Sequence, residues 1–150
     1  MMRRDIVKRW INVIITFYSA EEGRQMATWD LSQTVHHVLI CNGGSCMRKG
    51  GEEVTVALRE SITRAGLDDV VHTTRTRCNG RCEDACVVIV YPEGIWYENV
   101  TPDHTEQLVE QHLRKGEPVE SLLTHRFKPD GFERTATART GILKSEKAKK

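Results

Sequence analysis

The segment VHHVLICNGGSC (residues 35–46) joins a short run of β-branched and apolar residues to a glycine-rich loop bounded by two cysteines. Val35 to Ile40 has the composition and the length of a buried strand. Cys41 follows this strand at once, and Cys46 comes after four further residues, two of which are glycine. The segment therefore predicts a strand whose carboxyl end opens into a loop with two thiols.

A helix and a second strand follow this loop. Apolar residues recur at helical spacing between Glu52 and Ala65, and Gly66 supplies a left-handed stop. Val70 to Thr76 is typical of a second strand. A strand–helix–strand unit of this length favours two parallel strands in one sheet, because the helix brings the chain back across the sheet.

The rest of the pattern completes a mixed α/β domain. Val87 to Tyr91 and Ile95 to Tyr97 flank a Pro-Glu-Gly turn and predict a hairpin. Thr101 is a suitable N-cap with proline at the first helical position, and Gly116 ends the helix that begins there. The order β-α-β-β-β-α is that of the thioredoxin-like fold, an α/β (α+β) arrangement with a mixed sheet flanked by helices.

Composition narrows the class of protein. A chain of 150 residues suits one domain with its own hydrophobic core, so it does not need disulfides for stability. Its five cysteines cannot all pair as disulfides, which favours thiol chemistry or metal binding. Residues 26–125 hold nine Lys/Arg and fifteen Asp/Glu, which argues against nucleic acid as a partner. The longest apolar run, residues 10–18, is far shorter than the roughly 20 residues that cross a bilayer. We expect no membrane association and a cytoplasmic location.

The two ends of the chain differ from its middle and predict three regions. Residues 1–33 are expected to be an N-terminal extension, mobile or amphipathic rather than a secretion signal, with Met26 a candidate for the true start. Residues 34–125 are expected to form the thioredoxin-like domain. Residues 126–150 carry eight Lys/Arg against three Asp/Glu without apolar periodicity, which predicts a basic, disordered tail.

Two pairs of cysteines carry the functional prediction. Cys41 and Cys46 follow the first strand, and Cys78 and Cys82 follow the second in Cys-Asn-Gly-Arg-Cys. Parallel strands bring both loops to the same edge of the sheet, where open α/β sheets usually hold ligands. Two irons bridged by two sulfides need four terminal thiolates, one pair per iron, and nearby glycines let backbone N–H groups approach the sulfur atoms. The pattern favours a [2Fe–2S] cluster.

Other uses of these thiols stay open at this point. Tetrahedral zinc accepts overlapping cysteine spacings, so a zinc-stabilised interaction module with a basic tail is an alternative. A dithiol oxidoreductase would use Cys-x-x-Cys, which the chain lacks. Cys86 precedes an apolar strand and is best interpreted as a small core residue. His36 and His37 are expected on opposite faces of the first strand, so both cannot easily ligate one iron.

Four pieces of the sequence match one known family. They are GSC at residues 44–46, Cys78-x₃-Cys82, VIVYPEGIWY at residues 88–97, and VEQHL at 109–113 leading to GEPV at 116–119. On these pieces, the stretch from His37 to Leu123 resembles the thioredoxin-like [2Fe–2S] ferredoxins. That family includes the Shethna-type ferredoxins and the small flavoprotein-associated subunit of NADH:quinone oxidoreductase.

The resemblance implies a ligand set, an activity and a kind of partner. The cluster ligands would be the four cysteines of the two loops, Cys41, Cys46, Cys78 and Cys82. The chain would be a soluble one-electron carrier without catalytic residues, and its partner would be a redox protein such as a reductase or flavoprotein. The alternatives are a small subunit of a flavin- and NAD-dependent oxidoreductase complex and a protein with a role in cobalamin synthesis; a homodimer is also compatible with the resemblance.

Two local features add to this expectation. Ala85-Cys86 stands where the family usually has a Gly-Pro step, so no role for Cys86 follows from the resemblance. Four basic residues flank the proposed ligands and predict a positive rim around them: Arg48, Lys49, Arg77 and Arg81.

Overall fold

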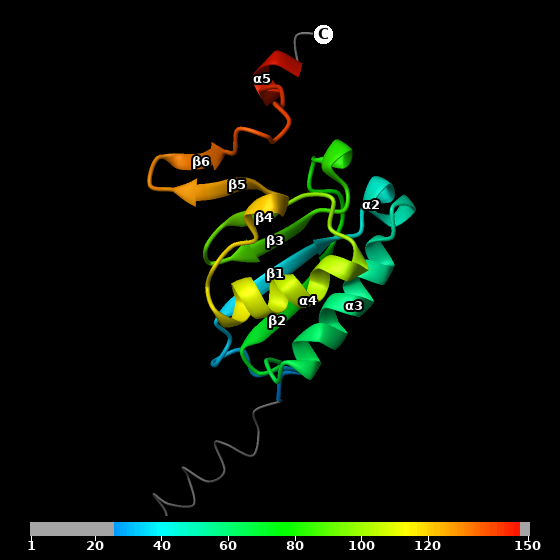
Figure 1. Cartoon of the computed structure of the whole chain (residues 1–150), viewed down its shortest axis with the longest axis vertical. Coiled ribbons are helices and arrows are strands. Elements are labelled where there is room, and N and C mark those ends of the chain that lie inside the picture. Colours follow the sequence, from blue (N-terminus) through cyan, green and yellow to red (C-terminus); the bar gives the residue numbers. More distant parts are fainter. Residues whose placement is uncertain (1–25, 148–150) are drawn as a thin grey trace, which may run out of the picture. The chain divides into compact units, whose positions relative to one another are not determined.

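A mixed six-stranded sheet forms the centre of the computed structural model, which describes residues 26–147 (Figure 1). The strand order is β2-β1-β3-β4-β5-β6, and β1 (His36–Cys41) lies parallel to β2 (Val71–Thr76). All other neighbouring strands are antiparallel. The remaining strands are β3 (Val88–Tyr91), β4 (Ile95–Tyr97), β5 (Leu123–Lys128) and β6 (Gly131–Arg134).

Two helical segments lie side by side across one face of the sheet (Figure 1). The first is α3 (Gly51–Arg64), and the second begins with a 3-10 turn at Pro102–His104, continues as α4 (Thr105–Gln107) and ends as a π-helix over Leu108–Arg114. Ser61 Oγ of α3 lies 3.2 Å from Thr105 Oγ1 of α4, so the two segments also meet through a buried polar contact. The predicted order β-α-β-β-β-α, and with it the thioredoxin-like fold, is confirmed.

The hydrophobic core fills the space between these helices and the sheet. Alternate residues of the central strands point toward the helices, as expected for a sheet covered on that face. The side chains that meet there include Val38, Leu58, Val88, Val90, Leu108 and Leu113. Tyr97 is completely buried among them, and its hydroxyl accepts a hydrogen bond from Val119 N–H (3.1 Å). The hydroxyl therefore has its own hydrogen free for His112 Nδ1, which lies 2.8 Å away.

The C-terminal region differs from the expected irregular tail. β5 runs across the predicted domain boundary at residue 125, and β6 pairs with it through a turn at Pro129-Asp130-Gly131. Pro-Asp-Gly between two strands is a turn signal with a clear physical basis, because proline presets the backbone and glycine accepts a positive φ, here +122°. The Phe127 and Phe132 rings pack edge to face across the hairpin at 5.4 Å.

The chain before β1 has no helix or strand between residues 26 and 35. The predicted N-terminal extension covers residues 1–33, of which residues 1–25 lie outside the described part of the chain. Met26 as the true start stays a prediction. Within residues 26–147, no helix is both long and apolar enough to cross a membrane.

Replacing Tyr97 with phenylalanine tests the buried hydroxyl. Tyr97→Phe leaves Val119 N–H and His112 Nδ1 without their partner, so the free energy of unfolding should fall by about 1–3 kcal/mol in urea titrations. Tyr91→Phe removes a hydroxyl from an exposed tyrosine of β3 and should change the free energy of unfolding by less than about 0.5 kcal/mol. Equal effects of the two substitutions would contradict this role for Tyr97.

Candidate metal centre

The parallel pairing of β1 with β2 brings two cysteine-containing loops to one edge of the sheet. The register pairs Cys41 with Thr76, the last residues of the two strands. Asn42 N–H extends the pairing by donating to Thr76 O at 2.8 Å. Cys78 follows two residues after β2 ends. The first cysteine loop (residues 41–50) and the second cysteine loop (residues 77–84) therefore start side by side.

Cys41 and Cys46 form a buried thiol pair. Their residues are 3% and 2% exposed, and Cys46 is carried by the short helix α2 (Gly44–Arg48), where the sequence suggested only a loop. The Cys41 thiol donates a weak hydrogen bond to Arg77 O of the second cysteine loop at 3.7 Å. Burial raises the pKa of the Cys46 thiol to about 12, so ligation of a metal by this thiol would release a proton.

Gly43 marks the closest approach of the two loops. A β-carbon at this position would lie 2.7 Å from Cys78 Cα and 2.9 Å from Cys78 Cβ, closer than real side chains come. The Gly43 backbone angles, φ −68° and ψ 167°, are open to any residue. Glycine is therefore required here because a side chain would collide with Cys78, and not because of the backbone angles. At the neighbouring Gly44, a β-carbon would meet only the mobile end of Arg48, at 3.3 Å.

Cys78 and Cys82 form an exposed thiol pair whose sulfur atoms lie 3.4 Å apart. Gly80 N–H donates to Cys78 Sγ at 3.3 Å, and the positive φ of Gly80 (+79°) makes this turn accessible to glycine in particular. That N–H, together with the Cys82 thiol, lowers the pKa of Cys78. The contact with Cys78 raises the pKa of Cys82, so the two sulfurs share one proton more readily than they give up both.

All four predicted ligands line one small cavity, together with Gly43, Ser45 and Arg81. The thiols stand as two pairs, one from each loop. Within residues 26–147, no three His, Cys, Asp or Glu side chains already surround a single point as the ligands of one metal ion do. Two thiol pairs facing one cavity fit a dinuclear iron–sulfur core, which takes two thiolates at each iron.

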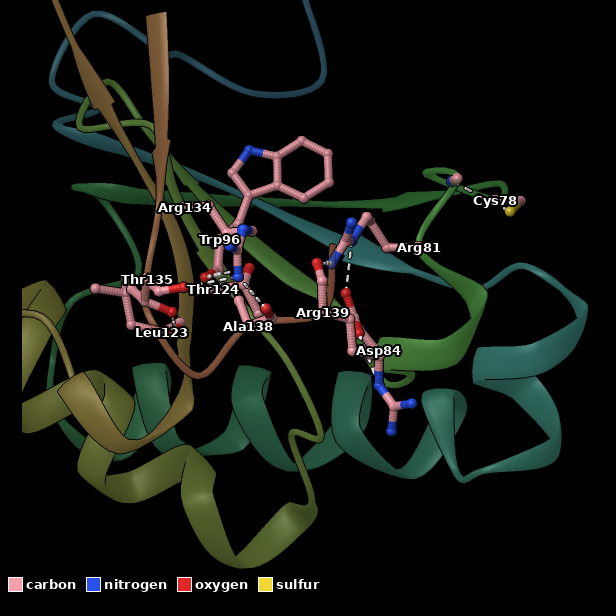
Figure 2. Close-up of polar contacts among 11 residues, drawn as sticks. Cys78, Arg81, Asp84, Trp96, Leu123, Thr124, Arg134, Thr135, Ala138 and Arg139 are labelled. Atoms are coloured by element: carbon pink, nitrogen blue, oxygen red, sulfur yellow. Dashed lines mark hydrogen bonds and ion pairs between the residues drawn. The ribbon is translucent and has the colours of Figure 1, made fainter. Parts of the chain in front are cut away.

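Arg81 has a different role from the predicted positive rim. Its Nε donates to Asp84 Oδ2 at 2.6 Å (Figure 2). The three other residues of the predicted rim, Arg48, Lys49 and Arg77, are exposed. The Asp84 side chain is only 2% exposed, and sequence reasoning did not single it out. An acidic residue three positions after an arginine, within a tight turn such as Cys82–Asp84, is the signal that would have found it.

Cys86 and the two histidines lie apart from the cavity. Cys86 is 1% exposed, and its thiol donates to the carbonyl oxygens of Cys46 (3.4 Å) and Lys49 (3.3 Å). Burial raises the pKa of this thiol, in keeping with the predicted core residue. His36 is buried 2.9 Å from Glu93, whereas His37 is exposed on the opposite face of β1, as expected.

The fold and the site together define a thioredoxin-like domain with four cysteines around one cavity at a sheet edge. The sequence profile of the family described as thioredoxin-like [2Fe-2S] ferredoxin matches residues 4–113. This chain belongs to that family.

Relatives in several bacteria support the assignment. A Priestia megaterium protein provisionally named 2Fe-2S ferredoxin is 53% identical over 107 residues, covering 71% of this chain and 84% of its own length. The 2Fe-2S ferredoxin of Aquifex aeolicus is 39% identical, over 64% of this chain and 95% of the relative. The solved structure of the thioredoxin-like [2Fe-2S] ferredoxin from A. aeolicus aligns with a TM-score of 0.60 at 37% identity, again over 64% of this chain and 96% of that structure.

The contact at Gly43 yields a prediction with a matched control. Gly43→Ala should lower the free energy of unfolding by about 1–3 kcal/mol, because the added methyl group collides with the Cys78 backbone and forces the two cysteine loops apart. Gly44→Ala should be nearly neutral, since the end of the Arg48 side chain can move away. Urea titrations of both variants check this, and a Gly43→Ala chain as stable as Gly44→Ala would contradict the close contact.

Proposed function

We propose that this protein is a ferredoxin whose four site cysteines hold a [2Fe–2S] cluster and which carries one electron at a time. The observation that carries the proposal is that two thiol pairs line one cavity in a chain of the thioredoxin-like [2Fe-2S] ferredoxin family. Relatives from A. aeolicus and Clostridium pasteurianum bear the name 2Fe-2S ferredoxin. The proposed ligands are Cys41, Cys46, Cys78 and Cys82.

The cluster, when bound, supplies the redox chemistry by taking up and releasing one electron. The protein sets the surroundings of the four sulfurs. Cys41 and Cys46 are held away from water, so their side of the centre has a low dielectric environment. Gly80 N–H points at Cys78 Sγ and favours additional negative charge there. These two contributions oppose each other, because burial disfavours charge and the hydrogen bond favours it.

The exposed thiol pair indicates on which side of the protein electrons would be exchanged. Cys78 and Cys82 are exposed to solvent, whereas Cys41 and Cys46 are buried. A partner that approaches the second cysteine loop comes nearest to the centre. We infer that a redox protein such as a reductase or flavoprotein docks on this side, in the cytoplasm, without nucleic acid or membrane. Homodimer formation, membership of a flavin- and NAD-dependent complex and a place in cobalamin synthesis stay predictions.

We expect no catalytic residue on the second helical segment, where polar side chains have structural partners. Glu110 pairs with Arg114 at 2.9 Å, and Thr101 N–H donates to His104 Nδ1 at 3.1 Å as part of the helix cap. These contacts stabilise the helix, which gives Glu110 and His104 a structural role.

Iron and sulfide analysis of the purified chain tests the proposed function. Protein prepared without oxygen should contain about two irons and two sulfides per chain and show visible absorption that bleaches with dithionite. Colourless protein with one zinc per chain would contradict the proposal.

Cysteine variants test the ligand assignment. Cys78→Ala and Cys82→Ala each remove one terminal ligand from the same iron, so less than about a tenth of the wild-type iron and sulfide should remain after purification. Cys86→Ala removes a buried thiol outside the cavity and should keep the visible spectrum. Bleached Cys86→Ala protein, or fully loaded Cys78→Ala protein, would show that the assignment is wrong.

A further inference from the structure

Residues 134–141, the C-terminal strap, return from β6 to the second cysteine loop (Figure 2). Thr135 fixes the start of the strap on β5, because its N–H donates to Thr124 O at 2.8 Å and its hydroxyl to Leu123 O at 2.9 Å. Arg134 Nη1 donates to Ala138 O, and Ala138 is 4% exposed. The strap is thus an ordered segment, and it lies beyond residues 4–113, the part of the chain that the family profile matches.

One buried carboxylate joins the strap to the second cysteine loop. Asp84 ends the 3-10 turn that starts at Cys82, and its side chain is 2% exposed. Arg81 Nε of the loop lies 2.6 Å from Asp84 Oδ2, and Arg139 Nε of the strap lies 3.5 Å from Asp84 Oδ1. Arg81 also donates through Nη2 to Arg139 O at 3.0 Å, which closes a three-residue cluster (Figure 2).

This cluster has a physical reason to stay together. A buried carboxylate loses its hydration and needs charged or hydrogen-bonding partners to remain favourable. Asp84 Oδ1 has no hydrogen bond of good geometry within the described part of the chain, and Arg139 Nε lies 3.5 Å from it as a counter-charge. Loss of Arg139 would leave Arg81 as the cationic partner of both oxygens and would draw that side chain away from its present position. Arg81 lies between Gly80 and Cys82 and lines the thiol cavity, so its movement displaces the second cysteine loop.

We propose that the C-terminal strap is a positioning element for the second cysteine loop, with Arg139 acting through Asp84 and Arg81 to hold Cys78 and Cys82 in place. The effect on a cluster rests on the proposed function, whereas the anchoring of the loop does not. Arg139 is a positioning residue because it touches neither the thiols nor the cavity that they line.

Hydrogen exchange in the full-length chain tests the anchoring. Arg139→Ala should accelerate exchange about two- to fivefold at the amides of Gly80 and Asp84, which donate to Cys78 Sγ and Arg81 O, and leave α3 unchanged. That factor corresponds to the loss of an ion pair with one exposed partner. Arg139→Lys should restore slow exchange. Arg126→Ala is the control, because it breaks an ion pair between Arg126 of β5 and the exposed Glu120 (2.8 Å), away from the loop. Unchanged exchange in Arg139→Ala, or the same acceleration in Arg126→Ala, would overturn the proposal.

The reduction potential separates positioning of the loop from a general loss of stability, because loss of stability alone does not shift it. In cluster-loaded protein, Arg139→Ala should shift the midpoint potential and the electron-spin spectrum, and Arg139→Lys should return both to the wild-type values. A potential equal to wild type in Arg139→Ala would overturn the link from strap to centre. If the wild-type chain holds no cluster, the proposed function fails, and hydrogen exchange on the same chain still decides whether the strap anchors the loop.

Discussion

The parallel pairing of β1 with β2 is the constraint on which the rest of the site depends. Because Cys41 pairs with Thr76 at the end of both strands, the two cysteine loops leave the sheet at the same edge. A one-residue slip of this register would turn Cys41 toward the other face of the sheet and separate the thiol pairs. The helix α3 and the apolar side chains beneath it fix that register, since Val38 and Ile40 must face the core. The hydrophobic core therefore determines how the two thiol pairs approach each other.

The centre is asymmetric in its exposure to water. The pair of Cys41 and Cys46 is buried, with Cys46 on α2. The pair of Cys78 and Cys82 lies on a turn that is open to solvent. Gly43 permits both pairs to approach one cavity, since any side chain there would hold the loops apart. Such an arrangement suits a carrier, which must protect its cofactor on one side and present it to a partner on the other. The Arg81–Asp84–Arg139 cluster extends this logic beyond the cysteine loops, because it ties the exposed turn to a part of the chain that follows the family's common core.

Sequence reasoning identified the features with local signatures. The strands before each cysteine pair, the helix that ends at Gly66 and the order of elements followed from periodicity and caps, and they are present in the structure. Helix α2 was missed because its five residues, GSCMR, contain no apolar repeat. The β5–β6 hairpin was also missed, although Pro129-Asp130-Gly131 is a sound turn signal, because the many charges after residue 125 suggested a solvated tail.

Contacts between distant residues were beyond the reach of the sequence. Arg81 and Arg139 are separated by 58 positions, so nothing in either local pattern indicates that they share one buried carboxylate. The close approach of Gly43 to Cys78 is similarly a property of two loops and not of one. The four cysteines of the two loops could be proposed together as ligands because metal chemistry limits the residue types and the spacing, and their ligation stays a prediction.

Mössbauer spectroscopy of the ⁵⁷Fe-enriched protein tests the central claim most directly, because it reports the number, the ligands and the oxidation state of the irons together. The account predicts two sites of equal intensity with the parameters of tetrahedral sulfur coordination, and after one-electron reduction one ferric and one ferrous iron per chain. A single iron site, or iron with oxygen or nitrogen as its main ligands, would contradict a [2Fe–2S] cluster held by Cys41, Cys46, Cys78 and Cys82.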